Sequence, residues 1–285
     1  MTHGTDRTRS TGAILVTGCS SGIGHETALR LARRGHTVYA TARDVDAIAD
    51  LGGAGCHLLP LDVTDEESMR LAVATVEAEH GQVGVLVNNA GYGQYGPVER
   101  VAMDDVRRQF ETNVFGLARM CQLVLPAMRA ARHGRIVNVS SMGGRLTFPA
   151  GGYYHASKHA VEALSDALRF EVAGFGVSVS VVEPGLIRTR FGETARERHA
   201  EDESSGPYAG FTAASRAVLV SSYRGPLASG PAPVARAIEH AATARRPRTR
   251  YRVTLGAKVL ITTRRFAPDR VWDALVARSF PRPAG

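Results

Sequence analysis

Lysine is almost absent from this chain. Of its 35 lysine and arginine residues only Lys158 and Lys258 are lysines, so an ordinary surface cation here is an arginine, and a lysine inside a motif is conspicuous. Cysteine is scarce as well, since Cys19, Cys56 and Cys121 show no paired spacing and no Cys-x-x-Cys. The cysteine pattern argues against a disulfide framework and predicts a reducing, cytoplasmic setting with no structural metal.

Long apolar runs are also missing. No run approaches the ~18–20 consecutive apolar residues that cross a bilayer, so we expect no transmembrane segment. Residues 1–11 are polar and charged without an apolar centre, which predicts a disordered tail in place of a signal peptide or an anchor. The chain is 44% hydrophobic, and its length suits one large α/β domain or two small ones. The alternation of strands and helices described below favours a single domain over residues 12–285.

Negative charge is in the minority, and the formal net charge is +8. A basic excess suits nucleic acid, an acidic membrane or an anionic cofactor. Aromatic residues do not interleave with the cations and no nucleic-acid-binding motif is present, so we expect no nucleic-acid partner. A solvated surface and an acidic surface partner both remain open for the arginines near the C-terminal end, which are Arg245, Arg246, Arg248, Arg250, Arg252, Arg264, Arg265 and Arg270.

Short apolar runs alternate with helical periodicity along most of the chain. Strands are predicted at 13–17, 36–41, 57–61, 84–88, 135–139 and 177–182, with a further one at 251–255. Helices are predicted between them, including 26–34, 64–80, 103–132 and 152–173. The alternation has no internal break, which predicts an α/β fold: a single-domain, doubly wound parallel sheet of the Rossmann type, with about seven strands and helices on both faces.

A glycine-rich segment joins the first predicted strand to the first helix. It contains Gly18, Ser20, Ser21, Gly22, Ile23 and Gly24, with the glycines in the spacing Gly-x-x-x-Gly-x-Gly. Glycines let the backbone approach a pyrophosphate, and the N–H groups at a helix start stabilise its charge. We interpret the segment as a dinucleotide-binding loop, and a tight turn without a ligand is the alternative.

The end of the second strand indicates which dinucleotide binds. Dinucleotide folds often place an acid there to bind the ribose hydroxyls. Ala42 stands at that position and Arg43 follows it, and a guanidinium can pair with a 2′-phosphate. The sequence therefore predicts NADP(H) in preference to NAD(H), with Asp44 in a shifted loop as the counter-argument.

Small and polar residues follow three other strands. Asp62 and Val63 follow the third strand, where an acid can accept from the adenine amino group or cap the next helix. Asn88 ends the fourth strand and is expected to tie neighbouring strands together. The other cofactor candidates, for which plain turns are the alternative, are Asn89, Ala90 and Gly91 after the fourth strand and Pro184, Gly185, Ile187 and Thr189 after the sixth.

Residues 137–158 bring together a hydroxyl, a phenol and an ammonium. Ser141 follows the fifth strand, at the sheet edge where open α/β sheets bind ligands. Tyr154 and Lys158 are four residues apart, so one helix face carries both side chains. Such groups can move a proton on and off a carbonyl or alcohol oxygen, and Lys158 is expected to hold the cofactor ribose as well. The structural alternatives are that Tyr154 is a buried packing residue, Lys158 a surface cation and Ser141 a helix cap.

Four other polar residues have simpler structural interpretations. Tyr153 is five residues before Lys158 and off its helix face, and His155 and His159 are interpreted as solvated or capping residues. Asn113 lies in the helical stretch 103–132. It is either a satisfied core amide or the holder of a water, in a kinked helix, that links Lys158 to solvent.

Taken in order and spacing, these motifs resemble the short-chain dehydrogenase/reductase family. The resemblance covers about residues 12–190 and rests on Thr17-Gly-x-x-x-Gly-Ile-Gly24, Asn88-Asn-Ala-Gly91, Asn113, Ser141, Tyr154-x-x-x-Lys158 and Pro184-Gly185. It implies a catalytic tetrad of Asn113, Ser141, Tyr154 and Lys158, and a homodimer or homotetramer. Arg43 resembles the NADP-preferring branch, and the sequences around Gly18 and Arg43 are similar to those of hydroxysteroid and retinol dehydrogenases.

After residue 190 the resemblance fades and the composition changes. Residues 190–230 are rich in serine, glycine and alanine, and their aromatic residues favour a lid over an apolar substrate; these are Phe191, Tyr208, Phe211 and Tyr223. Residues 231–285 form the predicted C-terminal extension. Its amphipathic segment 257–280 contains Trp272 and can pack on the domain, form a dimer face or make peripheral membrane contact.

The sequence thus predicts an NADP(H)-dependent oxidoreductase that interconverts a ketone or aldehyde and an alcohol by hydride transfer, with Tyr154 as general acid and base. The partner is expected to be a small apolar molecule of steroid, retinoid or polyketide type. The alternative is a non-catalytic NADP(H)-binding regulator or scaffold on the same fold, which would not need the tetrad. A sugar epimerase or dehydratase is disfavoured, because the chain after residue 190 leaves little room for a sugar-nucleotide domain.

Overall fold

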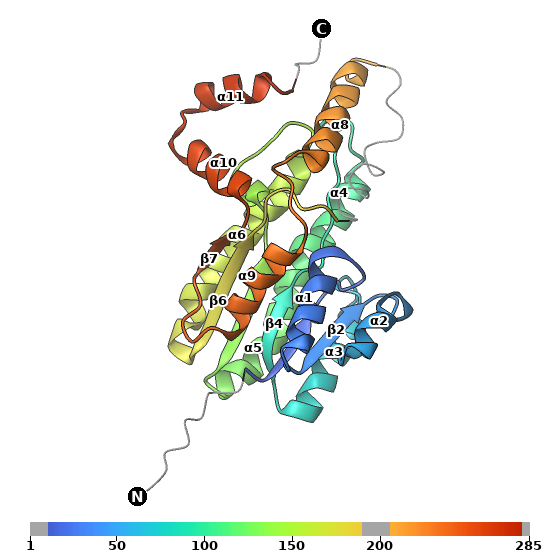
Figure 1. Cartoon of the computed structure of the whole chain (residues 1–285), viewed down its shortest axis with the longest axis vertical. Helices are drawn as coiled ribbons and strands as arrows, with labels where there is room; N and C mark the ends of the chain where they lie inside the picture. Colours follow the sequence, from blue (N-terminus) through green and yellow to red (C-terminus); the bar gives the residue numbers. More distant parts are fainter. Residues whose placement is uncertain (1–10, 190–205, 281–285) are drawn as a thin grey trace, which may run out of the picture.

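The fold is organised around one parallel β-sheet (Figure 1). The computed structural model describes residues 11–189 and 206–280. Within them, seven strands hydrogen-bond in the order β3-β2-β1-β4-β5-β6-β7, and every neighbouring pair is parallel. The strands are β1 (Ala13–Val16), β2 (Val38–Ala42), β3 (His57–Pro60), β4 (Val83–Asn88), β5 (Gly134–Val139), β6 (Val177–Glu183) and β7 (Arg250–Arg252). The doubly wound α/β sheet predicted from the sequence is confirmed.

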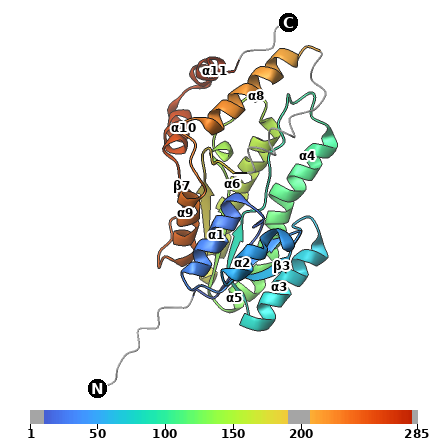
Figure 2. The same ribbon diagram turned by 45° about the vertical axis from the view of Figure 1, so that its right-hand side comes forward.

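Helices cover both faces of this sheet (Figures 1 and 2). One face is covered by α1 (Gly22–Arg33), η1 (Asp46–Ile48), α2 (Ala49–Gly53) and α9 (Ala232–Thr243). The other face is covered by α3 (Glu66–His80), α5 (Leu117–Ala130) and α6 (Gly152–Val172). Strands β1 and β4 are therefore buried on both sides, which explains why their sequences are continuous apolar runs without alternation.

The helix predicted over 103–132 is divided into three segments. α4 (Met103–Phe110) passes into a π-helical segment, η2 (Glu111–Gly116), and this passes into α5. Asn113 lies inside the π-helical segment and is completely buried. A single π turn inside an α-helix is a common feature of functional sites. The irregularity therefore falls at the polar residue that the sequence analysis singled out.

Strand β7 corrects part of the interpretation of the C-terminal arginines. Arg250 and Arg252 were expected on a solvated or partner-binding surface, but they pair with carboxylates inside the fold. Arg250 Nη2 lies 3.0 Å from Glu162 Oε2, and Arg252 Nε lies 3.2 Å from Glu183 Oε2. Both glutamates are buried, so these two cations neutralise charge that would otherwise be uncompensated.

Three helices lie together beyond the sheet, at the top of both views (Figures 1 and 2). They are α8 (Ala209–Arg224), α10 (Leu255–Phe266) and α11 (Asp269–Ala277). α8 falls within the predicted lid 190–230. Residues 1–10 of the predicted tail and Phe191 of the predicted lid lie outside the described residues. None of the described helices is both long and apolar enough to cross a membrane.

The amphipathic segment predicted at 257–280 is two helices, α10 and α11, separated at Pro268. Trp272 of α11 is 6% exposed and belongs to an apolar cluster with Ile261 of α10. The cluster also contains Met142 and Leu146, from the loop that follows β5. The inner face of both helices therefore packs on the domain, next to the end of β5 where Ser141 lies.

Candidate active site

The loop between β1 and α1 is shaped to hold an anion on its backbone. Gly18 and Gly22 have φ angles of 73° and 62°, values that favour glycine. A Cβ on Gly24 would overlap the Gly18 carbonyl oxygen, and one on Gly22 would lie 2.9 Å from the Thr189 side chain. Ser21 makes no side-chain bond to the first turn of α1. The N–H groups of that turn are therefore available to a phosphate group.

The segment that follows β4 closes the adjacent side of this loop. Thr17 Oγ1 accepts hydrogen bonds from the backbone N–H groups of Asn89 and Ala90, both at 3.0 Å. Asn88 Nδ2 donates to Asn138 Oδ1 at 3.0 Å, which confirms that Asn88 ties neighbouring strands together. The loop is thus fixed between β1 and β4, where the strand order reverses and open α/β sheets bind their ligands.

Arg43 and Asp62 flank the same cleft at the ends of β2 and β3. Arg43 is exposed and lines the cleft. The Asp44 carboxylate accepts from the backbone N–H of Asp46 at 3.0 Å, so it is engaged in a local turn. Asp62 also lines the cleft, and its Oδ1 accepts from the backbone N–H of Thr64 at 2.9 Å. Arg43 thus lines the cleft at the end of β2, where the sequence analysis expects a 2′-phosphate.

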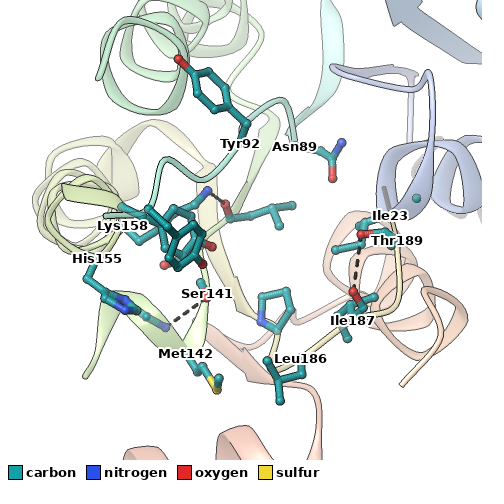
Figure 3. A pocket seen from close by; sticks show the side chains of 18 of the residues that line it. Ile23, Asn89, Tyr92, Ser141, Met142, His155, Lys158, Leu186, Ile187 and Thr189 are labelled. Carbon is teal, nitrogen blue, oxygen red and sulfur yellow. Dashed lines mark hydrogen bonds between the residues drawn. The ribbon is translucent and has the colours of Figure 1, made fainter. Parts of the chain in front are cut away.

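Ser141, Tyr154 and Lys158 converge on this cleft. Tyr154 and Lys158 are 6% and 5% exposed on α6, and both line the cleft. The Ser141 hydroxyl hydrogen-bonds the Tyr154 phenol, and its Oγ accepts from Gly143 N at 3.0 Å. Lys158 Nζ donates to Val139 O at 2.9 Å. Figure 3 shows Ser141 and Lys158 on one side of the pocket, with Thr189 on the other side, so hydroxyl, phenol and ammonium share one site as the spacing predicts.

Burial controls the protonation of these groups. It raises the pKa of Tyr154 from 10.0 to about 12, an effect that the Ser141 hydrogen bond opposes. It lowers the pKa of Lys158 from 10.5 to about 8, opposed by the Glu162 carboxylate one helical turn further on. At neutral pH the phenol is therefore protonated, and the ammonium keeps its charge in roughly 90% of molecules.

Asn113 lies behind the cleft and holds its wall in place. Its Oδ1 accepts from Tyr92 N at 3.0 Å, while its Nδ2 donates to Tyr92 O at 2.9 Å and to Ser157 Oγ at 3.1 Å. A Cβ added to Gly91 would lie 2.9 Å from Asn113 Oδ1 and 3.6 Å from Lys158 Nζ. Asn113 thus fixes the segment after Gly91 beside the ammonium. The water link between Lys158 and solvent stays a prediction.

One continuous cleft of about 970 Å³ joins the glycine loop to Tyr154. Every predicted site residue lines it except Gly24 and Asn113. Sequence reasoning missed the outer part of the cleft, whose apolar lining comes from several separate segments: Met142, Phe148, Leu186, Leu219, Leu260 and Phe280. No local pattern identifies these residues, because only the tertiary fold brings them together.

The predicted lid aromatics divide into two groups. Tyr223, on α8, lines the cleft. Tyr208 and Phe211 instead pack on each other with ring centroids 6.5 Å apart, and the Tyr208 hydroxyl donates to Glu99 at 2.7 Å. Tyr208 and Phe211 do not line the cleft, whereas Tyr223 does, and the lid over the substrate stays a prediction.

The interpretation of His155 as a solvated or capping residue is wrong. Its ring is buried in the cleft wall, and its Nδ1 lies 3.2 Å from Gly143 O (Figure 3). A Cβ on Gly143 would overlap the ring, and one on Gly151 would lie 2.7 Å from Nε2. Helical spacing could have predicted the burial of His155, because His155, like Lys158, lies on the buried face of α6. Tyr153 is outside the site, as predicted, and its hydroxyl donates to Val98 O at 3.2 Å.

Buried His155 should make the protein sensitive to acid. Burial lowers the pKa of His155 from 6.5 to about 4, with the Gly143 hydrogen bond opposing the shift. Between about pH 4 and pH 6.5 the unfolded chain binds a proton at this histidine that the folded chain does not, so folding stability falls as the pH falls. The expected loss is about 2 kcal/mol between pH 7 and pH 5. Denaturant unfolding of the wild type and His155→Asn at both pH values measures it.

His155→Asn keeps a nitrogen near Nδ1 but does not titrate, so its stability should fall by about 2 kcal/mol less than that of the wild type. His57→Asn, at an exposed histidine on β3, is the matched control and should behave as the wild type. Equal losses in the wild type and His155→Asn would contradict the neutral, buried state of His155.

The arrangement defines a class of protein. An anion-binding glycine turn lies at the switch point of a parallel sheet, and it shares its cleft with a buried phenol and ammonium. Gly18, Gly22 and Gly24 have no room for a Cβ, so the turn stays tight and its backbone N–H groups remain open to a phosphate, which fits a dinucleotide cofactor. A proton-transfer group beside a dinucleotide is the equipment of an oxidoreductase.

Comparison with known proteins gives the family. The sequence profile described as short chain dehydrogenase matches residues 12–200, and the chain belongs to this family of oxidoreductases. Human retinol dehydrogenase 5 is 35% identical over 289 residues, covering 95% of this chain and 89% of that protein. The similarity to the retinol dehydrogenase side of the family, expected from the sequence, is confirmed.

Solved structures show the same fold. A short-chain dehydrogenase from Streptomyces avermitilis has a TM-score of 0.79 and 34% identity, with 95% of each chain covered. The closed form of serine dehydrogenase complexed with NADP+ has a TM-score of 0.73 and 28% identity, covering 85% of this chain and 94% of that chain.

Proposed function

We propose that the protein is an NADP(H)-dependent oxidoreductase that interconverts an apolar ketone or aldehyde and the corresponding alcohol. The observation that carries this proposal is the meeting of Ser141, Tyr154 and Lys158 in the cleft that contains the glycine loop. A packing tyrosine and a surface lysine would have no reason to share a buried cleft with a phosphate-binding turn.

In the direction of reduction, Tyr154 is the proton donor. The nicotinamide cofactor supplies the hydride to the carbonyl carbon when bound, and negative charge builds on the carbonyl oxygen. Tyr154 is protonated at neutral pH and gives its proton to that oxygen, while the Ser141 hydroxyl stabilises the developing charge by a hydrogen bond. Lys158 holds the ribose hydroxyls and keeps a positive charge beside the phenol.

In the direction of oxidation, Tyr154 must accept a proton, which a pKa of about 12 opposes. At an effective dielectric constant of about 20, a unit charge ~4 Å away lowers a pKa by up to about three units. The pKa of about 12 is that of the phenol with Lys158 already in place, so Lys158 alone is insufficient at neutral pH. Two cations are needed, the Lys158 ammonium and the oxidised nicotinamide.

The cofactor contacts follow the order of the cleft. We assign the adenosine end to Arg43, Asp62 and Val63. The pyrophosphate is assigned to the glycine loop, which contains Gly18, Ser20, Ser21, Gly22, Ile23 and Gly24. The nicotinamide end is assigned to two segments, Asn89, Ala90 and Gly91 after β4 and Pro184, Gly185, Ile187 and Thr189 after β6. The cleft that all of them except Gly24 line supports this order.

Arg43→Asp tests the preference for NADP(H). Replacing the guanidinium by a carboxylate removes charge-assisted hydrogen bonds to the 2′-phosphate and adds repulsion, so KM for NADPH should rise about 10-fold to 100-fold. KM for NADH should stay the same or fall. Steady-state kinetics with both coenzymes measure the shift, and Arg70→Asp, at an exposed arginine of α3 outside the cleft, is the control. Unchanged coenzyme kinetics would remove the argument for NADP(H).

The apolar outer part of the cleft supports an apolar substrate. Met142, Leu219 and Leu260 line it beyond the Ser141 and Tyr154 hydroxyls. Absorbance at the reduced-nicotinamide band, followed with both coenzymes over a panel of ketones, steroids and retinoids, tests the proposal. Oxidation of NADPH by an apolar member is the expected result. Tight NADPH binding with no turnover of any member would favour a non-catalytic regulator.

The domain organisation is part of the proposal. Leu219 and Tyr223 of α8 line the cleft, which supports residues 190–230 as a substrate lid and 231–285 as a C-terminal extension to a single domain. Three buried, unpaired cysteines support a reducing, cytoplasmic setting. We also propose a homodimer or homotetramer, which sedimentation velocity of the purified chain measures.

A further inference from the structure

The helices α10 and α11 carry apolar side chains on two opposite faces. Their inner face packs on the domain through Ile261 and Trp272. On the other side of α10, Leu255, Val259 and Phe266 are exposed by 71%, 54% and 76%. The inner face accounts for the folding of these helices on the domain and leaves the outer apolar side chains without a role there.

The exposed apolar residues form one stripe with cations in it, which we name the outer face. On α10 the residues Leu255, Lys258, Val259 and Phe266 follow the spacing of a single helix face, with Arg265 beside them. On α11 and just after it, the corresponding exposed residues are Arg270, Val271, Leu275 and Arg278. In both views α10 and α11 lie at the outer edge of the molecule (Figures 1 and 2).

Positive charge predominates on this surface. Lys258, Arg265, Arg270 and Arg278 are exposed there, against the carboxylates of Asp269 and Asp273. Asp269 is already paired, because Arg264 Nη2 lies 2.7 Å from its Oδ1. Cations interleaved with exposed leucine, valine and phenylalanine are the composition of a helix that lies in the headgroup region of an anionic membrane.

We propose that the outer face of α10 and α11 docks on an anionic lipid bilayer. The apolar side chains enter the boundary between headgroups and acyl chains, and the cations bind lipid phosphates. A second copy of this chain is the poorer partner, because a symmetric contact would bring the same cations together. A nucleic acid is poorer too, since phosphates alone would leave Leu255, Val259 and Phe266 facing water.

The docking face lies next to the opening of the cleft. Leu260 of α10 and Phe280, after α11, line the cleft, as does Leu227, which is also exposed. Docking therefore places the apolar part of the cleft beside the bilayer. An apolar ketone or alcohol dissolved in lipid would then reach Tyr154 from the membrane, a consequence that rests on the proposed function, whereas the docking does not.

Flotation of the purified full-length protein with lipid vesicles tests the docking. Each cation near an anionic surface strengthens binding by roughly fivefold, so vesicles that contain phosphatidylglycerol should bind the protein more than about tenfold more tightly than pure phosphatidylcholine vesicles. The difference should shrink at high salt. Equal binding to both vesicles, or none to the anionic ones, would overturn the proposal. The assay needs no turnover, so its result is separate from any failure of the activity assay.

Two variants separate the apolar and the charged contributions. Val259→Asp with Phe266→Asp should weaken binding to the anionic vesicles more than about tenfold, and Lys258→Glu with Arg265→Glu should do the same. Phe170→Asp is the matched control, since Phe170 of α6 is 88% exposed and lies outside the outer face, and it should bind as the wild type. Far-ultraviolet circular dichroism checks that each variant is folded.

Other partners give different results. Self-association in lipid-free buffer that Val259→Asp with Phe266→Asp abolishes would show a protein interface and overturn the proposal. Binding to duplex DNA that persists in the same variant and competes with vesicles would show a nucleic-acid surface and overturn it as well.

Discussion

Tyr154→Phe should lower turnover by about 10²–10⁴ in both directions while leaving coenzyme binding unchanged. The substitution removes only the phenolic oxygen, so the ring keeps its place in the wall of the cleft. That oxygen hydrogen-bonds Ser141 and carries the proton in the proposed reaction. Steady-state kinetics measure turnover, and the quenching of protein fluorescence by NADPH measures coenzyme affinity.

Tyr153→Phe is the matched control for this prediction. Its hydroxyl is one residue away along α6, but it donates to Val98 O outside the site, so its removal should leave turnover within about twofold of the wild type. Near-normal turnover in Tyr154→Phe, or equal losses in the two variants, would contradict the assignment of Tyr154 as the proton donor.

Lys158→Met should have two opposite effects. Turnover should fall by about 10²–10³, because the variant loses the cation that shares the cleft with the phenol. A unit charge ~4 Å from a group is worth up to about 4 kcal/mol. Folding stability at neutral pH should rise. Burial holds the pKa of Lys158 at about 8 against 10.5 in the unfolded chain, which means that the charged form destabilises the fold by about 3 kcal/mol.

The sign and the pH window of this effect can be checked. Between about pH 8 and 10.5 the unfolded chain binds a proton that the folded chain does not, so wild-type stability should rise with pH across this window. Methionine removes the charge and also the hydrogen bond to Val139 O, which is worth about 1 kcal/mol. The expected net gain at pH 7 is about 2–3 kcal/mol.

Lys258→Met is the control, because Lys258 is the other lysine of the chain and lies exposed on α10. It should change neither turnover nor the slope of stability against pH. Destabilisation of Lys158→Met at pH 7, measured by denaturant unfolding, would contradict the buried ammonium. Full activity of that variant would contradict its role beside Tyr154.

The residues whose placement could be predicted from the sequence are those whose position is set by local spacing. The glycine loop lies between a strand and a helix, and steric exclusion at Gly22 and Gly24 makes glycine necessary there. Tyr154 and Lys158 share a cleft because four residues are one helical turn. The strands were predicted because a parallel sheet buried on both faces requires continuous apolar runs.

The residues that it missed depend on tertiary contacts or on a one-residue irregularity. The π-helical turn around Asn113 shifts the helical register, and its one glycine, Gly116, stands only at its end, so the sequence does not show where the turn begins. Arg250 resembles any other arginine of a basic segment until β7 places it against Glu162. His155 could be assigned to the buried face of α6 only after that face was known.

The central claim is that two cations bring the Tyr154 phenol to a pKa at which it can exchange its proton. Titration of the tyrosinate absorbance with and without NADP+ tests this most directly. The pKa of about 12 is that of the free protein, in which Lys158 is already present, so the bound oxidised cofactor should lower it by up to about three units, to about 9. In the wild type, NADP+ should therefore produce tyrosinate below pH 10, and in Tyr154→Phe it should produce none. Binding of NADP+ to the wild type with no tyrosinate below pH 10 would contradict the account.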